Sequence, residues 1–165
     1  MSDAFSPRKR SSIMSAVRRE GGALERRLWE ILGGLGVKFS RHRRDLAGSP
    51  DVVLAAGRIA VFVHGCFWHG HPGCRRAVLP KSHVKFWSTK IASNRRRDAY
   101  VVRKLRRGGY SVVTVWGCQM ADALKIGRRI VSALSRASAA REGQAPPLAA
   151  SPKRVPSTRV RRRED

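Results

Sequence analysis

The segment VHGCFWHGHPGC, at positions 63–74, constrains the fold more than any other part of the chain. It holds two of the three cysteines and three of the five histidines in the sequence. Cysteine and histidine are the usual ligands of structural zinc, which is bound in a tetrahedron. The ligands of one metal must lie close together, so the part of this segment from Cys66 to Cys74 is predicted to be a short loop.

Four residues are candidates for such a zinc site. Cys66, His71 and Cys74 supply three ligands from one short loop, and Cys118 is the only cysteine left to supply the fourth. An odd number of cysteines does not suit a disulfide framework, and their use in one cluster favours metal binding in a reducing compartment. The alternative interpretation is three buried thiols that pack as small hydrophobic side chains.

Apolar patterning predicts one α/β domain over residues 23–137. The expected order is helix, strand, strand, strand, helix, strand, helix, at residues 23–36, 38–50 (a basic strand or loop), 51–57, 58–65, 83–108, 110–118 and about 120–137. The segments RIAVFVHG and YSVVTVWGC are almost continuously apolar, as strands covered on both faces of a sheet are. The chain, at 165 residues, is long enough for one domain with a core and too short for two.

Leu24, Leu28, Ile31, Leu32 and Leu35 form the predicted apolar face of the first helix, and Leu124, Ile130, Val131 and Leu134 that of the last. In the long middle helix, Asn94 and Asp98 fall on the same stripe as Trp87 and Ile91. An acid on the apolar side of a helix is expected to have a buried partner or to belong to a functional site.

The chain carries 35 Lys and Arg against 11 Asp and Glu, a formal net charge of +24, which predicts a polyanionic partner such as nucleic acid. Residues 1–22 are predicted to be a basic N-terminal arm. Residues 138–165, rich in Ala, Pro, Ser and Arg, are predicted to be a disordered basic tail. No apolar segment approaches the ~20 residues of a membrane span and no secretory signal opens the chain, so a cytoplasmic protein is expected.

Two histidines of the loop, His64 and His69, are in excess of a tetrahedral zinc site. Asp51 begins one predicted strand and these histidines follow the end of the next, so the three side chains are expected at neighbouring strand ends. A carboxylate is a hard ligand for Mg²⁺, and a neutral imidazole can accept a proton from water or contact a phosphate. On residue types alone, a metal-dependent nuclease and a zinc-stabilised nucleic-acid-binding module are equally favoured.

Seven motifs spread along the chain resemble those of the very short patch repair endonuclease family, Vsr, in order and spacing. They are RSSIMSAVRR, ALERRLWEIL, SPDVV, FVHGCFWHGHPGC, FWSTKI, NRRRD and GYSVVTVWGC, and they span about residues 8–120. The resemblance implies a restriction-endonuclease-like α/β fold, with a mixed central sheet flanked by helices and a structural zinc site. It also implies a monomeric enzyme that nicks DNA 5′ of the mismatched thymine in T:G mispairs left by deamination of 5-methylcytosine.

The family's site residues carry over onto matching positions of this chain. The resemblance implies that Asp51 binds Mg²⁺ together with the backbone carbonyl of Val63, and that His69 is the general base for the attacking water. His64 would contact the region of the scissile phosphate. Asp98 would support the histidine chemistry, and Glu25 would be an accessory acid of the site.

Adjacent aromatic residues are more often core than ligand contacts, but Phe67 and Trp68 lie in a tight loop between zinc ligands. An apolar wedge between bases is therefore plausible for this pair, and the family resemblance implies it, with Trp87 as a third partner. Because Trp87 also lies on the apolar stripe of its helix, a core role is almost as well supported. Trp29 and Trp116 are predicted to be core residues.

Two features depart from the family pattern. Val63 stands where threonine is common, and Pro72-Gly73 adds one residue to the zinc loop. Two alternatives therefore stay open, a restriction-like nuclease of other specificity and a non-catalytic zinc-stabilised nucleic-acid-binding protein. The family further implies mismatch-repair proteins as partners and nucleoid DNA as the place of action.

Overall fold

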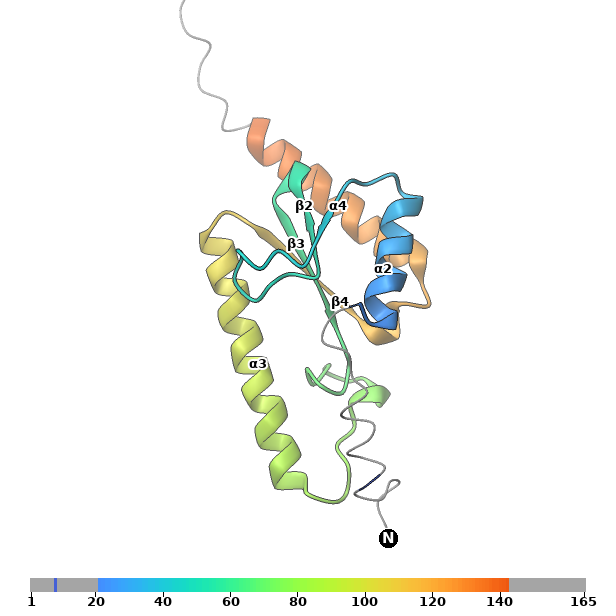
Figure 1. Cartoon of the computed structure of the whole chain (residues 1–165), viewed down its shortest axis with the longest axis vertical. Helices are drawn as coiled ribbons and strands as arrows, with labels where there is room; N and C mark the ends of the chain where they lie inside the picture. The colour runs from blue at the N-terminus through green and yellow to red at the C-terminus, as the bar shows by residue number, and fades with distance from the viewer. Residues whose placement is uncertain (1–7, 9–20, 143–165) are drawn as a thin grey trace, which may run out of the picture.

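Four strands form one mixed sheet with helices on both faces, as the computed structural model shows (Figure 1). The structure describes Arg8 and residues 21–142. Its elements are α2 (Ala23–Gly34), β1 (Ser40–Arg41), β2 (Val52–Leu54), β3 (Ile59–His64), α3 (Val84–Arg107), β4 (Ser111–Trp116) and α4 (Ala123–Glu142). The order of helices and strands is the predicted one, and the mixed α/β fold class is confirmed.

The sheet has the order β1-β2-β3-β4, with β3 and β4 parallel and the other pairs antiparallel. Parallel neighbours need a crossover, which α3 provides. Val52 pairs with Val61, and His64 pairs with Trp116. This register places the start of β2, the end of β3 and the end of β4 side by side at one end of the strands. The candidate site residues lie at this end.

The core lies mainly between the sheet and the pair α2 and α4. Leu28, Leu32 and Ile130 from these helices are fully buried against Val61 and Leu54 of the sheet. A smaller cluster on the other face joins Leu105 of α3 to Ala60 and Phe62 of β3. Alternate residues of β3 therefore face opposite helical layers, which explains why its sequence is continuously apolar.

The last strand and the last helix differ from the prediction. β4 is the edge strand, and only Val115 in it is buried, so it is not covered on both faces as expected. α4 begins at Ala123 because the Asp122 carboxylate accepts the N–H of Lys125 at 2.9 Å, which caps the helix.

The same helix continues through an Ala-rich stretch to Glu142, past the expected end at Ala137. Residues 138–142 are therefore helical, contrary to the prediction of disorder. The rest of the predicted tail, and all of the predicted arm except Arg8, Gly21 and Gly22, lie outside the described residues. No helix within the described part of the chain has the length and hydropathy of a membrane span.

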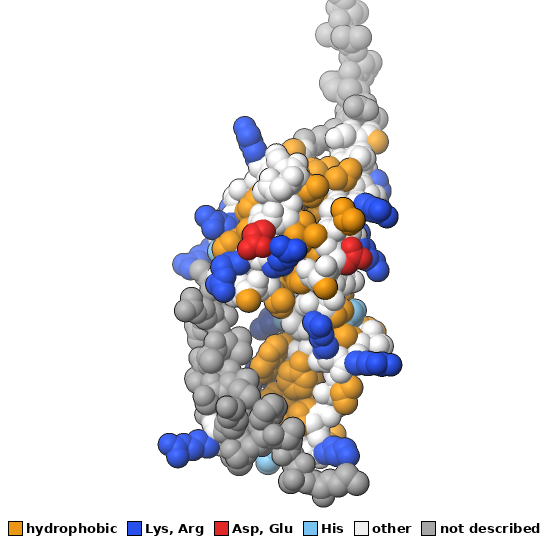
Figure 2. Space-filling view, turned by 90° about the vertical axis from the view of Figure 1, so that its right-hand side faces the viewer, with side chains coloured by type: hydrophobic (Ala, Val, Ile, Leu, Met, Phe, Trp, Pro, Cys, Tyr) orange, Lys and Arg blue, Asp and Glu red, His pale blue; other side chains and the backbone are white. Residues whose placement is uncertain are grey.

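Three leucine and valine side chains assigned to the core are exposed instead. Leu35 is 43%, Leu124 75% and Val131 49% exposed. They line an apolar groove of about 650 Å³ between α2 and α4, on the side of the molecule where Figure 2 shows hydrophobic side chains gathered among Lys and Arg. Leu35 follows the last residue of α2, so the helical spacing that predicted its burial no longer applies to it.

Candidate active site and metal centre

The loop after β3 is held in a compact turn by its own backbone. The N–H of His71 donates to the carbonyl of Cys66 at 2.9 Å, and the N–H of Cys74 donates to the carbonyl of His71 at 3.3 Å. Gly70 has φ of +58°, and a Cβ there would lie 2.7 Å from Ile91 of α3. Only glycine fits such a close approach in this conformation, so the loop is pressed against α3.

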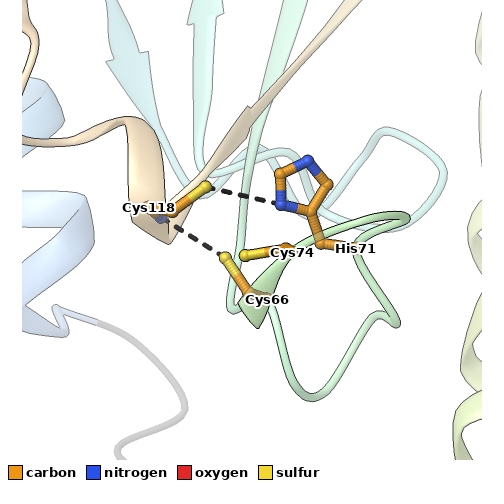
Figure 3. A group of neighbouring side chains, drawn as sticks. All are labelled: Cys66, His71, Cys74 and Cys118. Atoms are coloured by element: carbon orange, nitrogen blue, oxygen red, sulfur yellow. Dashed lines mark hydrogen bonds between the residues drawn. The ribbon is translucent and has the colours of Figure 1, made fainter. Parts of the chain in front are cut away.

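This turn brings the four predicted zinc ligands together. The donor atoms of Cys66, His71, Cys74 and Cys118 all lie within 4.8 Å of one another. Three come from the loop, and Cys118 comes from the turn after β4 (Figure 3). Cys118 Sγ lies 3.4 Å from His71 Nδ1, near the roughly 3.6 Å between ligands of a tetrahedral zinc. The chain therefore has a Cys/His cluster able to bind a metal.

The thiols of this cluster are not equivalent. Burial raises the pKa of Cys118 to about 11, while the backbone N–H of Arg76 lowers the pKa of Cys74. A thiol with a raised pKa is protonated at neutral pH unless a cation stabilises its thiolate. The donor set thus fits a metal such as zinc, which binds cysteine as thiolate.

A second group of site residues surrounds a polar cleft of about 410 Å³ between the strand ends and α3. Asp51, His64, His69 and Asp98 line it, so the structure brings these four predicted residues together. The segment before Asp51 also packs closely on α3. Gly48 has φ of +73°, and a Cβ there would clash with Val101 at 2.5 Å.

His69 and Asp98 form the closest polar contact in the cleft. His69 Nδ1 lies 2.6 Å from Asp98 Oδ2, and the two side chains are 19% and 20% exposed. Asn94, one turn earlier on α3, donates to the carbonyl of Trp68 at 2.8 Å and ties the loop to the helix. Asp98 therefore has the partner that its position on the apolar stripe predicted, and Asn94 also binds the loop.

His64 stacks on His69, with ring centroids 3.8 Å apart. Burial, and next the neighbouring His69, lowers the pKa of His64 to about 4. Its imidazole is therefore neutral at physiological pH. A neutral ring still has one N–H donor and one nitrogen acceptor for a substrate.

Asp51 lies just before β2, where the antiparallel register sets it opposite the end of β3. Its Oδ2 accepts the N–H of Val63 at 2.7 Å. Burial raises the pKa of Asp51 to about 6, the Val63 hydrogen bond lowers it, and the nearby Glu25 carboxylate raises it further. A partly buried carboxylate of this kind is suited to bind a cation, which would favour its charged form.

Glu25 reaches Asp51 from α2, and one histidine that the sequence analysis left without a role joins them. His42 Nε2 lies 3.3 Å from Glu25 Oε2, and Glu25, His42 and Asp51 form a group able to hold a metal. No metal-ligand spacing marks His42 in the sequence, because its partners come from α2 and from the residue before β2. Its φ of +48° is a backbone feature that only the structure reveals.

The aromatic residues form one cluster of edge-to-face contacts. Phe67 lies 5.2 Å from both Trp68 and Trp87, measured between ring centroids. Phe67 and Trp68 are partly exposed, whereas Trp87 is only 4% exposed. The structure thus favours the core interpretation of Trp87. Its buried ring packs against Phe67 and Trp68.

Trp29 packs against the core as expected, but Trp116 has a more specific environment. Its ring stacks on His71 at 4.2 Å and meets His64 edge-on at 5.4 Å. It is partly exposed rather than fully buried. Trp116 therefore joins the Cys/His cluster to the polar cleft.

Comparisons with known proteins show the family of this chain. The family model for DNA mismatch endonuclease Vsr matches residues 2–76. Type II nicking enzyme V.XorIIP from Xanthomonas oryzae is 43% identical over 122 residues, 74% of this chain and 89% of the relative. DNA mismatch endonuclease Vsr from Escherichia coli is 36% identical over 120 residues, 73% of this chain and 76% of the relative.

A nicking enzyme from Neisseria meningitidis, V.NmeAIP, is 34% identical over 120 residues, 73% of this chain and 85% of the relative. In all three cases, the aligned share of this chain is large enough to include most of the folded domain.

Proposed function

The chain belongs to the Vsr family of DNA mismatch endonucleases, and we propose from this premise that it nicks one DNA strand 5′ of the mismatched thymine in T:G mispairs. The family and its nicking relatives make the chain a DNA endonuclease that acts on mismatches. The position of the nick and the origin of the mispair in 5-methylcytosine deamination are the proposed part. The observation that carries the proposal is the polar cleft where Asp51, His64, His69 and Asp98 meet.

His69 is the proposed general base. Its Nδ1 faces Asp98 Oδ2 at 2.6 Å, so a proton on Nδ1 is shared with the carboxylate. This leaves Nε2 as the acceptor that can take a proton from the attacking water. Asp98 is the positioning residue in this scheme, because it fixes both the ring orientation and the tautomer.

Asp51 and the Val63 carbonyl are the proposed ligands of Mg²⁺, a cation that prefers oxygen donors. When bound, Mg²⁺ supplies positive charge beside the scissile phosphate. The N–H of Val63 donates to Asp51, and in extended backbone the N–H and C=O of one residue point to the same side of the strand, so the Val63 carbonyl is directed to the side of Asp51. The side chain of Val63 has no part in such a contact, so the replacement of threonine is compatible with metal binding.

His64 and Arg97 are the proposed contacts of the phosphate. Both line the cleft. The neutral His64 imidazole donates one N–H, and Arg97 offers a fixed positive charge with several donors. Glu25, 13% exposed and close to Asp51, is proposed as an accessory acid of the same site.

Zinc is the proposed occupant of the Cys/His cluster, with a structural role. Three of its ligands come from the loop that carries His69 and the fourth, Cys118, from the turn after β4, so a bound zinc would fix this loop relative to the end of β4. The one residue that Pro72-Gly73 adds to the loop does not separate the ligands, whose donor atoms lie within 4.8 Å of one another.

Phe67 and Trp68 are the proposed wedge that enters the base stack beside the mismatch. Both are partly exposed and rest on the buried Trp87. Apolar side chains inserted between bases unstack and kink DNA, which costs least at a mispair. The enzyme is further proposed to act as a monomer on nucleoid DNA in the cytoplasm, with mismatch-repair proteins as partners.

The site assignment is tested by nicking of a T:G duplex in Mg²⁺ with the wild type and Asp51→Asn. We expect the variant to lose nicking while it still binds the duplex, because the basic surface that attracts phosphates is unchanged. Glu30→Gln is the matched control, since Glu30 lies on the exposed face of α2 and pairs only with Arg27 among the contacts described for it. Nicking at the wild-type rate by Asp51→Asn would overturn the assignment.

A further inference from the structure

Glu25 and Asp51, whose roles are proposed above, form a compact cluster of donors with His42, which has no assigned role. One donor atom from each lies within 4.8 Å of the others. They come from α2, from the segment after β1 and from the start of β2, so three parts of the fold converge on one point. Two carboxylates and one imidazole are a donor set that divalent cations of the first transition row accept.

The distance between His42 and Glu25 is that of an ion pair without a short, strong hydrogen bond. His42 Nε2 and Glu25 Oε2 are 3.3 Å apart, longer than the ~2.7–2.9 Å of a charge-assisted hydrogen bond. The His69–Asp98 pair in the same site, at 2.6 Å, has the short distance expected of such a bond. Two adjacent ligand atoms of an octahedral cation lie about 3.0 Å apart. The 3.3 Å between His42 Nε2 and Glu25 Oε2 is close to this value, so both atoms are placed to bind one ion.

The backbone holds His42 in this position. Its φ of +48° lies in the left-handed region, which is uncommon for residues other than glycine. The N–H of His42 donates to the carbonyl of Asp51 at 3.3 Å, and its ring meets Trp29 edge-on at 5.9 Å. The imidazole is therefore fixed to the same backbone unit that carries the Asp51 carboxylate.

We propose that His42 is a nitrogen ligand of the divalent cation at Asp51, with Glu25 as a further oxygen ligand. The inference rests on the proposed metal role of Asp51 and extends it to a mixed nitrogen and oxygen site. A nitrogen ligand makes the site more favourable for Mn²⁺ than a site of oxygens alone, because Mg²⁺ prefers oxygen and Mn²⁺ also accepts imidazole. His42 is thus a metal-binding residue of the nuclease site and not only a partner of Glu25.

Pulsed electron paramagnetic resonance on the Mn²⁺-loaded, zinc-containing full chain tests this directly, since it detects the ¹⁴N nucleus of a coordinated imidazole. We expect a ¹⁴N coupling in the wild type that is lost in His42→Asn, where asparagine tolerates the left-handed backbone but is too short to reach the ion. Mn²⁺ affinity should fall about tenfold or more. His42→Gln is a second variant, and its zinc content and thermal transition report whether the fold is intact.

His69→Gln is the matched control, because it removes another imidazole of the cleft and should keep the coupling. A coupling that persists in both His42 variants, or that disappears only in His69→Gln, would overturn the inference. So would the absence of bound Mn²⁺ in the folded wild type. In any of these cases, loss of nicking by Asp51→Asn would still support the proposed function, so the two failures are distinguishable.

Discussion

Replacement of Asp98 by asparagine probes the contact on which the proposed general base depends. The carboxylate lies 2.6 Å from His69 Nδ1, and both side chains are about four-fifths buried, at 20% and 19% exposed. Asparagine keeps the shape but removes the charge. Its amide can also turn its NH₂ towards Nδ1, which stabilises the tautomer with the proton on Nε2, where no proton can be accepted from water.

The expected effect follows from the strength of this contact. A hydrogen bond to a charged group contributes about 1.5–3 kcal/mol, and each 1.36 kcal/mol changes a rate about tenfold. Asp98→Asn should therefore slow nicking roughly 10- to 150-fold, towards the upper end if the wrong tautomer dominates. DNA affinity should stay near the wild-type value, because the carboxylate acts on the histidine and not on the duplex.

Single-turnover nicking of an end-labelled T:G duplex at saturating enzyme measures this rate apart from binding, and a gel-shift titration gives the affinity. Asp45→Asn is the control of equal charge change, since Asp45 is 57% exposed and its surface pair with Arg43 contributes little. A wild-type nicking rate for Asp98→Asn in a folded preparation would refute the role of this pair. Equal losses of rate and of thermal stability would point to a structural effect instead.

Three further predictions follow from the same geometry. Cys118→Ala should remove bound zinc and lower the thermal transition, as measured by metal analysis and calorimetry. Stoichiometric zinc in folded Cys118→Ala would contradict a site that includes this thiolate. Apparent Mg²⁺ affinity should be constant above pH 7 and should weaken about tenfold per pH unit below pH 6, because protons compete with the cation for Asp51, whose pKa is raised to about 6. Calorimetric titration with Mg²⁺ at several pH values measures this affinity. An affinity that does not change with pH would contradict Asp51 as a ligand. The raised pKa of Asp51 also affects the free energy of unfolding, because the folded protein binds this proton more tightly than the unfolded chain does. Its stabilising contribution is fully present below about pH 4 and is lost as the pH rises through 6. Phe67→Ala should weaken binding to a T:G duplex by about 1–3 kcal/mol of stacking in a competition assay, with little change for a paired duplex, and an equal loss on both would contradict a wedge.

Local patterns in the sequence were enough to predict the order of elements and the Cys/His cluster. A few residues are enough to predict each of three elements: the His-rich loop, the strand that ends in His64 and the strand that ends before Cys118. Because β3 and β4 are parallel neighbours, the ends of these strands lie together. Asp98 was recognised because a charged residue on an apolar helical stripe requires a partner. These features depend on spacing along one element, which the sequence contains.

The remaining features depend on contacts between elements distant in sequence. His42 meets Glu25 and Asp51 through a left-handed backbone residue that no pattern marks. Leu124 and Val131 have helical spacing but face a groove, because the position of α2 beside α4 is set by the whole core. Trp116 is an apolar residue of a strand, yet β4 is the edge of the sheet, so its ring is free to stack on His71.

The most direct test of the central claim is strand-resolved mapping of the nick in Mg²⁺. The substrates are an end-labelled duplex with a T:G mispair in a CTWGG/CCWGG context, its fully paired counterpart and a duplex with a T:G mispair in an unrelated context. The account predicts one cut, on the thymine strand 5′ of the mismatched base, with the paired duplex left intact. Equal cutting of all three duplexes would contradict the mismatch specificity, and binding to them without any cut would contradict the catalytic role of the cleft.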